Sequence, residues 1–327
     1  MVVITRRPEF LWLLGLLCLA TVLALLAPLG WPFELFAHFR VQYAVVAMLL
    51  ATCFVWRRRR WAVVLALALA AWHAWPGAER LMAAPATAGC SGPAFSVITA
   101  NVEFSNGDHE AFLAWLDAHP ADLVVVQEVT EAWSKALVPR PAYPHYELLS
   151  REDPYGIAVL SRWPLESVQQ EDFAGDGLPS FAGTVQVAGQ PVRFVALHTH
   201  WPVVPELARA RDTSLRAAAE LARSASTPVV LLGDLNLTPD APAFQQLVDE
   251  SGLQDVMRGR GWRPTWLAGF WPLALRIDHV LASPALCVEQ AEVGPDVGSD
   301  HRPVLARLAL PRQKLAAGAA RPAATAP

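Results

Sequence analysis

Val229-Val230-Leu231-Leu232-Gly233-Asp234-Leu235-Asn236 joins an aliphatic run to a carboxylate and an amide. A second stretch, Ser299-Asp300-His301-Arg302-Pro303, places a carboxylate and an imidazole just before Val304-Leu305. An uninterrupted aliphatic run is typical of a strand buried on both faces of a sheet. Polar groups at the end of such a strand cost free energy unless something partners them, and a metal ion or a reacting phosphate is one such partner. The two stretches together predict a catalytic cleft.

The region from 94 to 311 around these stretches alternates strand-like and helix-like segments. We expect strands at 95–102, 122–129, 156–161, 192–201, 227–236 and 277–283. Apolar residues recur at helical spacing in 108–119 and 206–224, which predicts a helix in each. Because strands and helices alternate and are followed by β-rich segments, the region predicts a layered α/β domain.

Polar residues lie at or near the ends of most of these strands. They are Asn101, Glu128, His198, His200, Asp234, Asn236, Asp278, His279, Asp300 and His301. Side chains two apart on a strand share a face, so Asp234 with Asn236, and His198 with His200, can each point to one side. Carboxylate and amide oxygens favour a hard cation such as Mg²⁺ or Mn²⁺ over zinc. The histidines can transfer protons near neutral pH.

Each of these residues taken alone also has a structural explanation. Asn101 could cap a turn, Glu128 could be an exposed strand end, and His200 could be a packed residue. We expect a structural role for His279, because its side chain should point away from that of Asp278. The ordered series as a whole favours a functional site.

The order of the motifs resembles the endonuclease/exonuclease/phosphatase superfamily. The matching pieces are, in chain order, Asn101, Gln127-Glu128, the segment 156–162, Thr199-His200, Gly233-Asp234-Leu235-Asn236, Ile277-Asp278-His279-Val280 and Ser299-Asp300-His301-Arg302-Pro303. The resemblance covers 94–311 and implies the four-layer α/β sandwich of the deoxyribonuclease I type. It also implies a metal-dependent hydrolase of phosphoester bonds, in which Glu128 is the principal carboxylate for Mg²⁺ or Mn²⁺, Asn101 lies close by and Asp300 helps to bind metal or phosphate.

The same resemblance implies roles for the remaining site residues. Asp234 and Asn236 would position the attacking water and the scissile phosphate. His301, oriented by Asp278, would be the general base or the electrostatic partner of the phosphate. A second active-site histidine is either His198 or His200; the Thr-His order and the following Pro202 favour His200.

The N-terminal region predicts a membrane anchor. There are three apolar segments, 10–29, 35–56 and 61–75 (or to 81); the first two have the ~20 residues that a bilayer-spanning helix needs, and the third is short unless it extends to 81. Arginines precede the first segment and fill 57–60, whereas 30–37 has Glu34 and no basic residue. The positive-inside rule then predicts a multi-pass inner-membrane protein with a cytoplasmic N-terminus and a periplasmic or extracellular catalytic domain. The first segment alone could instead be a cleaved signal peptide.

These patterns divide the chain into an anchor (1–83), a linker (84–93), a catalytic domain (94–311) and a disordered tail (312–327). Cys18 and Cys53 lie in apolar segments and are expected to be inert, whereas Cys90 and Cys287 could form a disulfide outside the cytoplasm. The net charge of −4 gives no basic footprint of the kind that general nucleic-acid binders carry.

We therefore hypothesise a membrane-anchored, metal-dependent phosphoesterase in which water attacks phosphorus without a covalent intermediate. The substrate could be a nucleic acid, a phospholipid or a small phosphate ester, and the bilayer is the expected partner; no obligate protein partner is evident. The alternatives are a phospholipid or small phosphomonoester hydrolase rather than a nuclease, and a catalytically silent binding domain that keeps the fold. Loops at 173–181 and 262–272 are expected to shape specificity.

Overall fold

Two six-stranded sheets face each other in the computed structural model, which describes residues 10–82 and 91–312. The first sheet has the order β11-β12-β1-β2-β4-β3, with β1 Ala94–Asn101, β2 Leu123–Gln127, β3 His145–Leu149, β4 Ile157–Ser161, β11 Cys287–Val293 and β12 Val304–Ala309. The second has the order β5-β6-β7-β8-β10-β9, with β5 Leu165–Glu171, β6 Ser180–Val187, β7 Gln190–His198, β8 Val229–Asp234, β9 Gln254–Asp255 and β10 Asp278–Ala282.

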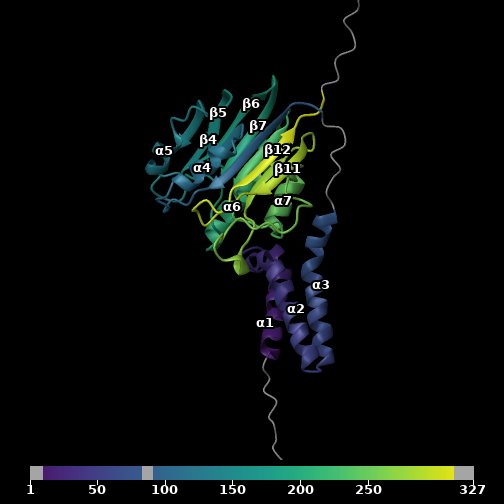
Figure 1. The fold of residues 1–327 in the computed structure, drawn as a ribbon. Helices are drawn as coiled ribbons and strands as arrows, with labels where there is room; N and C mark the ends of the chain where they lie inside the picture. Colours follow the sequence, from purple (N-terminus) through teal and green to yellow (C-terminus); the bar gives the residue numbers. More distant parts are fainter. Residues whose placement is uncertain (1–9, 83–90, 313–327) are drawn as a thin grey trace, which may run out of the picture.

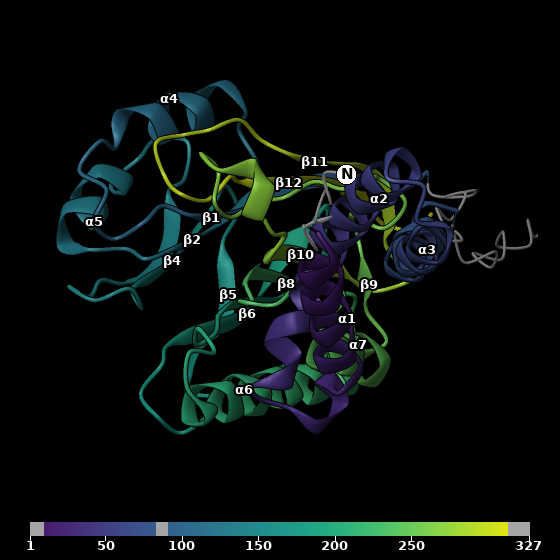
Figure 2. The same cartoon turned by 90° about the horizontal axis from the view of Figure 1, so that it is seen from below.

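Helices cover the outer face of each sheet, which gives the predicted four layers (Figure 2). Helices α4 (Glu110–Ala118) and α5 (Glu131–Leu137) pack Phe112, Trp115 and Trp133 against the first sheet. Helices α6 (Pro205–Ser224) and α7 (Pro242–Ser251) cover the second sheet. A third cluster of buried apolar side chains fills the space between the sheets. The expected deoxyribonuclease I-like sandwich is confirmed.

Strand β8 shows why the aliphatic run before Gly233 folds as a central strand. Val230 and Leu232 point into the core between the sheets, whereas Val229 and Leu231 point into the core beneath α6 and α7. Both faces are therefore buried, as a continuous apolar run requires. A Cβ atom on Gly233 would lie 1.6 Å from the carbonyl oxygen of Leu197, so only glycine lets β7 and β8 approach here and bring Asp234 to the strand end.

The strands that carry polar residues end at the same place. Strands β1 and β2 are parallel with Asn101 opposite Gln127, and β7 and β8 are parallel with His198 opposite Asp234. Strand β10 runs antiparallel to β8 and places Asp278 opposite Asp234. The polar ends of both sheets consequently meet at one edge of the sandwich.

All six predicted strands and both predicted helices are present in the catalytic region, as β1, β2, β4, β7, β8, β10, α4 and α6. The edge strands β3, β5, β9 and β11, the strand β6 beside β5, and the helices α5 and α7 are additional elements that we did not predict. Strand β12 is the strand that follows the motif at 299–303. The linker and the tail fall mostly outside the described residues, so those two boundaries stay predictions.

The N-terminal region forms a helical bundle that projects from the sandwich (Figure 1). It consists of α1 (Leu11–Leu25), the 3₁₀ helices η1 (Ala27–Leu29) and η2 (Phe33–Phe39), α2 (Arg40–Trp56) and α3 (Arg60–Met82). The second apolar segment is thus not one α-helix from residue 35, because 35–39 lie in η2. By length and composition, two helical segments could cross a membrane, Phe33–Trp56 and Arg60–Ala78; the apolar α1 is shorter.

The bundle buries a row of alanines between its helices and exposes many large apolar side chains. Ala47, Ala51, Ala62, Ala66 and Ala70 are buried together with Leu14, Leu17, Leu50 and Phe54, whereas Leu, Val and Trp side chains such as Leu49, Val64 and Trp56 are exposed. Small residues between helices are also a feature of helices that pack in lipid. Outside the bundle, Cys287 is disulfide-bonded, and Cys18 and Cys53 are free. Cys90 lies outside the described residues, so its pairing with Cys287 stays a prediction.

Candidate active site

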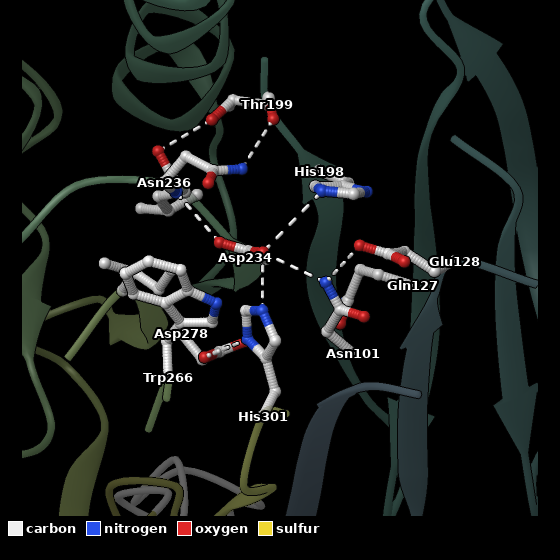
Figure 3. A network of polar contacts seen from close by, with 12 residues as sticks. Asn101, Gln127, Glu128, His198, Thr199, Asp234, Asn236, Trp266, Asp278 and His301 are labelled. Atoms are coloured by element: carbon white, nitrogen blue, oxygen red, sulfur yellow. Dashed lines mark hydrogen bonds and ion pairs between the residues drawn. The ribbon is translucent and has the colours of Figure 1, made fainter. Parts of the chain in front are cut away.

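Asp234, the last residue of β8, is the centre of a polar network between the two sheets (Figure 3). Its Oδ2 atom accepts a hydrogen bond from Asn101 Nδ2 (3.1 Å) and lies 3.6 Å from His198 Nε2 and 3.8 Å from His301 Nε2. Its Oδ1 atom accepts the backbone N–H of Asn236 (2.9 Å). A single carboxylate, only 1% exposed, therefore contacts groups contributed by both sheets.

Asn101, the last residue of β1, joins Asp234 to Glu128. Besides its bond to Asp234, Asn101 Nδ2 donates to Glu128 Oε1 (2.8 Å). Glu128 Oε2 accepts the backbone N–H of Phe104 (2.9 Å), which fixes the direction of the carboxylate. Glu128 adopts a positive φ of 65°, an uncommon conformation for a side chain of this size, where β2 ends.

His301 is held by Asp278, as expected. The two side chains lie 2.9 Å apart, between His301 Nδ1 and Asp278 Oδ2, and both are buried. When His301 is protonated, its Nδ1–H donates to the carboxylate and its Nε2–H points toward Asp234. His279 faces the other way, toward the carbonyl of Leu237 (2.8 Å) and the guanidinium of Arg276, which supports its structural role.

The structure brings His198, and not His200, to Asp234. His200 Nε2 lies 2.7 Å from Asp176 Oδ2, and its Nδ1 lies 3.1 Å from the hydroxyl of Tyr155. Both ring nitrogens of His200 are thus engaged away from the network. Strand β7 ends at His198, and the Thr-His order with the following Pro202, on which the preference for His200 depended, does not determine where the chain turns after the strand.

Asn236 and Asp300 lie at the rim of the network. Asn236 has a φ of 51°, which asparagine tolerates, and its Nδ2 donates to the carbonyl of Thr199 (2.9 Å). Asp300 is exposed; it accepts a hydrogen bond from the indole N–H of Trp266 (3.0 Å) and lies 3.8 Å from His301 Nε2.

Three further residues of the site were not predicted. Glu103 Oε2 accepts the backbone N–H of Asp300 (3.1 Å), and Trp266 and Tyr155 line the same cavity as Glu128 and Asp234. Glu103 lies two residues after Asn101, and this spacing is the sequence feature from which its place in the site could have been predicted. Trp266 lies in a loop expected to shape specificity, but nothing in the sequence pointed it at Asp300.

Burial and neighbouring charges shift the pKa values of the network in opposite directions. Burial, reinforced by the charge of Asp278, raises the pKa of Asp234 to about 7. Burial opposes the charged form of His301, but the attraction of Asp278, Asp234 and Asp300 outweighs it and raises the pKa of His301 to about 10. Burial, together with the charge of His301, lowers the pKa of His198 to about 3. At neutral pH the site therefore has a protonated His301 and a neutral His198.

The donors around Glu128 fit a hard divalent cation. Burial raises the pKa of Glu128, so a cation beside this half-buried carboxylate would stabilise its charge. Glu103 and Asp300 line the cavity with Glu128, and the set is rich in oxygen, as Mg²⁺ and Mn²⁺ prefer. Ligand atoms of Asp234, Asp278 and His301 also lie within 4.8 Å of one another, but the hydrogen bond between Asp278 and His301 already occupies two of them.

Comparisons with known proteins agree with this geometry. The model of the Endonuclease/Exonuclease/phosphatase family matches residues 98–301. Among curated proteins, the comparison found no match. One similar solved structure is an endonuclease/exonuclease/phosphatase from Beutenbergia cavernae DSM 12333, 24% identical with a TM-score of 0.53, covering 67% of this chain and 72% of that one.

Two other similar structures have related folds. Humanized D. rerio TDP2 is 19% identical with a TM-score of 0.54, covering 66% of this chain and 98% of that one. The 3′ phosphatase NExo from Neisseria, bound to product DNA hairpin, is 24% identical with a TM-score of 0.53, covering 65% of this chain and 98% of that one. At these identities the likeness concerns the fold. The family match includes every residue of the network from Asn101 to His301, and the chain belongs to the endonuclease/exonuclease/phosphatase family, as a hydrolase of phosphoester bonds.

Proposed function

We propose that this protein is a membrane-anchored, divalent-metal-dependent hydrolase in which water attacks phosphorus directly. The observation that carries the proposal is the pairing of the buried Asp234 carboxylate with the His301 imidazole at the wall of one cavity. A base and a cation 3.8 Å apart can serve the two sides of one phosphoryl transfer. Serine, cysteine and aspartate nucleophiles are unnecessary to this scheme.

Each side chain then has a defined task. Asp234, when ionised, accepts the proton of the attacking water, whose oxygen forms the new bond to phosphorus as the bond to the leaving oxygen breaks. His301, protonated and held by Asp278, donates its Nε2–H to a phosphoryl oxygen and stabilises the charge that develops there. Glu128, with Asn101 close by, would hold a cation whose charge offsets that of the phosphate and of the leaving oxygen.

The remaining residues of the site support the reaction. Asn236 can orient water by accepting a hydrogen bond at its side-chain oxygen, and the second N–H of its Nδ2, beyond the one that donates to Thr199, can donate to phosphate. Asp300 helps to hold the cation, and His198, neutral at pH 7, donates or accepts a hydrogen bond beside Asp234 without adding charge. A catalytically silent binding domain is the less economical alternative, because every side chain required for this chemistry is present.

A phosphoesterase assay of the full-length protein in detergent tests the proposal. We expect Mg²⁺- or Mn²⁺-dependent hydrolysis of bis(4-nitrophenyl) phosphate or 4-nitrophenyl phosphate, loss of activity with EDTA and recovery on adding the metal back. His301→Ala should lower the rate by about 10² or more. His145→Ala, on the outer strand β3, is the matched control and should retain the activity. Hydrolysis that is not inhibited by EDTA and that persists in His301→Ala would contradict the proposal.

We also propose that the catalytic domain lies outside the cytoplasm. The connection between α2 and α3 carries Arg57, Arg58 and Arg59, and it lies at the end of the bundle away from the sandwich (Figure 1). The positive-inside rule places these arginines in the cytoplasm. Alkaline phosphatase fused after Ala83 should be active, and the same reporter fused at Arg58 should be silent. The reverse pattern would overturn this topology.

A further inference from the structure

The cavity that contains the catalytic network has a second wall made by the N-terminal module. Its volume is about 630 Å³, large enough for an extended organic group besides a phosphate. One wall carries Glu128, Asp234 and His301, whereas Leu35 and Phe39 of η2 contribute to another. The anchor is thus part of the active site and does more than tether it.

Four polar contacts of 3.1 Å or less, together with the longer Arg40–Asp240 ion pair (3.5 Å), hold η2 and its neighbours in this position. Glu34 Oε1 lies 2.6 Å from Arg211 Nη2 of α6 in an ion pair whose side chains are at most 3% exposed. The other three are His38 Nδ1 to Thr238 Oγ1 (3.0 Å), Trp31 Nε1 to the carbonyl of Pro202 (3.1 Å) and Gln42 Nε2 to the carbonyl of Ala274 (2.9 Å). A buried ion pair is stable only when its geometry is good, so η2 has a defined position against the catalytic domain.

Exposed apolar side chains continue from the cavity toward the bundle. Trp201 and Val203 line the cavity and are 59% and 48% exposed. The segment between Trp266 and Leu275, both lining residues, exposes Phe270, Trp271 and Leu273. Aromatic side chains at this density are typical of the level where a membrane protein meets lipid headgroups, and the bundle beside them presents Leu, Val and Trp outward.

We propose that the substrate is a membrane lipid with a phosphoester headgroup, whose apolar chain reaches the cavity along Leu35, Phe39 and Val203 while the phosphate lies in the cavity beside His301 and Asp234. This inference rests on the proposed function and names its substrate class. An apolar wall continuous with the apolar helical bundle removes the chain of an amphiphile from water, a gain that the charged backbone of a nucleic acid cannot make. The reaction consumes one water, and the cleaved P–O bond releases an alcohol.

Matched substrates that share a headgroup test the inference on the full-length protein in nanodiscs or mixed micelles. The pairs are dioleoylphosphatidylglycerol with glycerophosphoglycerol, dioleoylphosphatidate with glycerol 3-phosphate, and farnesyl phosphate with dimethylallyl phosphate; DNA and RNA oligonucleotides complete the panel. In at least one pair, we expect kcat/KM for the long-chain member to exceed that of its partner by about tenfold or more. The glycerolipid and isoprenoid pairs separate the two sources of an apolar chain.

Variants of one helix connect this preference to the wall. Phe39→Ala should reduce the long-chain to short-chain ratio of kcat/KM by about tenfold. Phe36→Ala is the matched control, because Phe36 lies in the same helix but does not line the cavity, and it should leave the ratio unchanged. Val203→Ser, in an exposed loop outside the anchor, tests the same wall if Phe39→Ala does not fold.

The outcomes separate the two proposals. The lipid inference is overturned if the short-chain or nucleic-acid substrates are cleaved as efficiently as the lipids. It is also overturned if neither Phe39→Ala nor Val203→Ser changes the long-chain to short-chain ratio of kcat/KM. In both cases the proposed phosphoesterase activity stands. If no phosphoester in the panel or in the nitrophenyl assay is hydrolysed with metal present, the proposed function itself fails.

Discussion

His301 Nδ1 lies 2.9 Å from Asp278 Oδ2, and the two residues come from different sheets. Asp278 begins β10 of the second sheet, and His301 lies just before β12 of the first. The hydrogen bond therefore ties the two halves of the sandwich together at the catalytic edge and also keeps the imidazole charged. One carboxylate thus serves both the orientation of His301 and its protonation.

Asp278→Asn should move the whole pH profile of kcat to lower pH. Burial has the largest effect on both pKa values: it lowers that of His301 and raises that of Asp234. The charge of Asp278 raises both. Activity that needs protonated His301 is retained below its pKa of about 10 and lost above it, and activity that needs ionised Asp234 appears above its pKa of about 7. Without the Asp278 charge both pKa values fall, so the acidic and the basic limb of the pH profile both shift to lower pH.

Asp176→Asn, beside His200, is the control and should leave both limbs in place. Limbs that do not move in Asp278→Asn would contradict the prediction.

His198→Ala should cost far more activity than His200→Ala. His198 faces Asp234, whereas both nitrogens of His200 are bound by Asp176 and Tyr155. We expect kcat/KM to fall by about 10² for His198→Ala, the usual scale for a group that shares in proton transfer. His200→Ala should reduce it by less than tenfold. Steady-state kinetics of both variants on one substrate test this ranking. A larger loss of kcat/KM for His200→Ala would indicate that His200 is the second active-site histidine, as the Thr-His order suggested.

The difference between these two histidines shows where sequence reasoning stops. Asp234, Asn101 and Glu128 could be predicted because each lies at or just beyond the end of a buried strand, where the apolar run ends. His200 lies beyond the end of β7, and the chain around Thr199 is held by contacts to β8 and the loop after it: the Thr199 N–H to the carbonyl of Asp234 (3.0 Å) and the hydroxyl to the carbonyl of Leu235 (2.7 Å). These long-range contacts redirect the side chain, and no local pattern encodes them.

The outer strands were missed for a related reason. Strand β5 has only half-buried and exposed side chains, and β11 has one buried residue, so neither has the apolar run by which central strands are recognised. The polar side chains within the second apolar segment are explained by long-range contacts as well. His38, Arg40 and Gln42 contact the catalytic domain at Thr238, Asp240 and Ala274 respectively, and the hydropathy of the segment does not predict these contacts.

Glu128→Gln should weaken metal binding by more than tenfold. Glu128 is the carboxylate whose direction is fixed by Asn101 and by the Phe104 N–H, and neutralising it removes charge from the expected cation site. Asn101→Ala should weaken binding by about 10-fold through loss of that support. Mn²⁺ binding by the full-length protein, followed by electron paramagnetic resonance, measures this without relying on turnover. Glu131→Gln, at the start of the neighbouring α5, is the control; equal affinities in all four proteins would place the metal elsewhere.

Glu34→Gln should destabilise the full-length protein strongly. The change leaves the Arg211 guanidinium buried with only Asp212 as a charged partner, and a broken buried pair costs about 3–5 kcal/mol. An exposed pair with similar geometry exists for comparison: Glu206 Oε1 lies 2.8 Å from Arg209 Nη2, with both side chains more than two-thirds exposed.

Thermal unfolding in one detergent should therefore separate the two pairs. Glu206→Gln should cost less than about 1 kcal/mol, as exposed pairs usually do. The double change of Glu34→Gln with Arg211→Met should recover much of the loss, because it removes the uncompensated buried charge. Loss of the docking contact should also lower the long-chain preference, since Glu34 lies one residue before Leu35 in the helix that walls the cavity. Equal melting temperatures for Glu34→Gln and Glu206→Gln would show that η2 is not held by this ion pair.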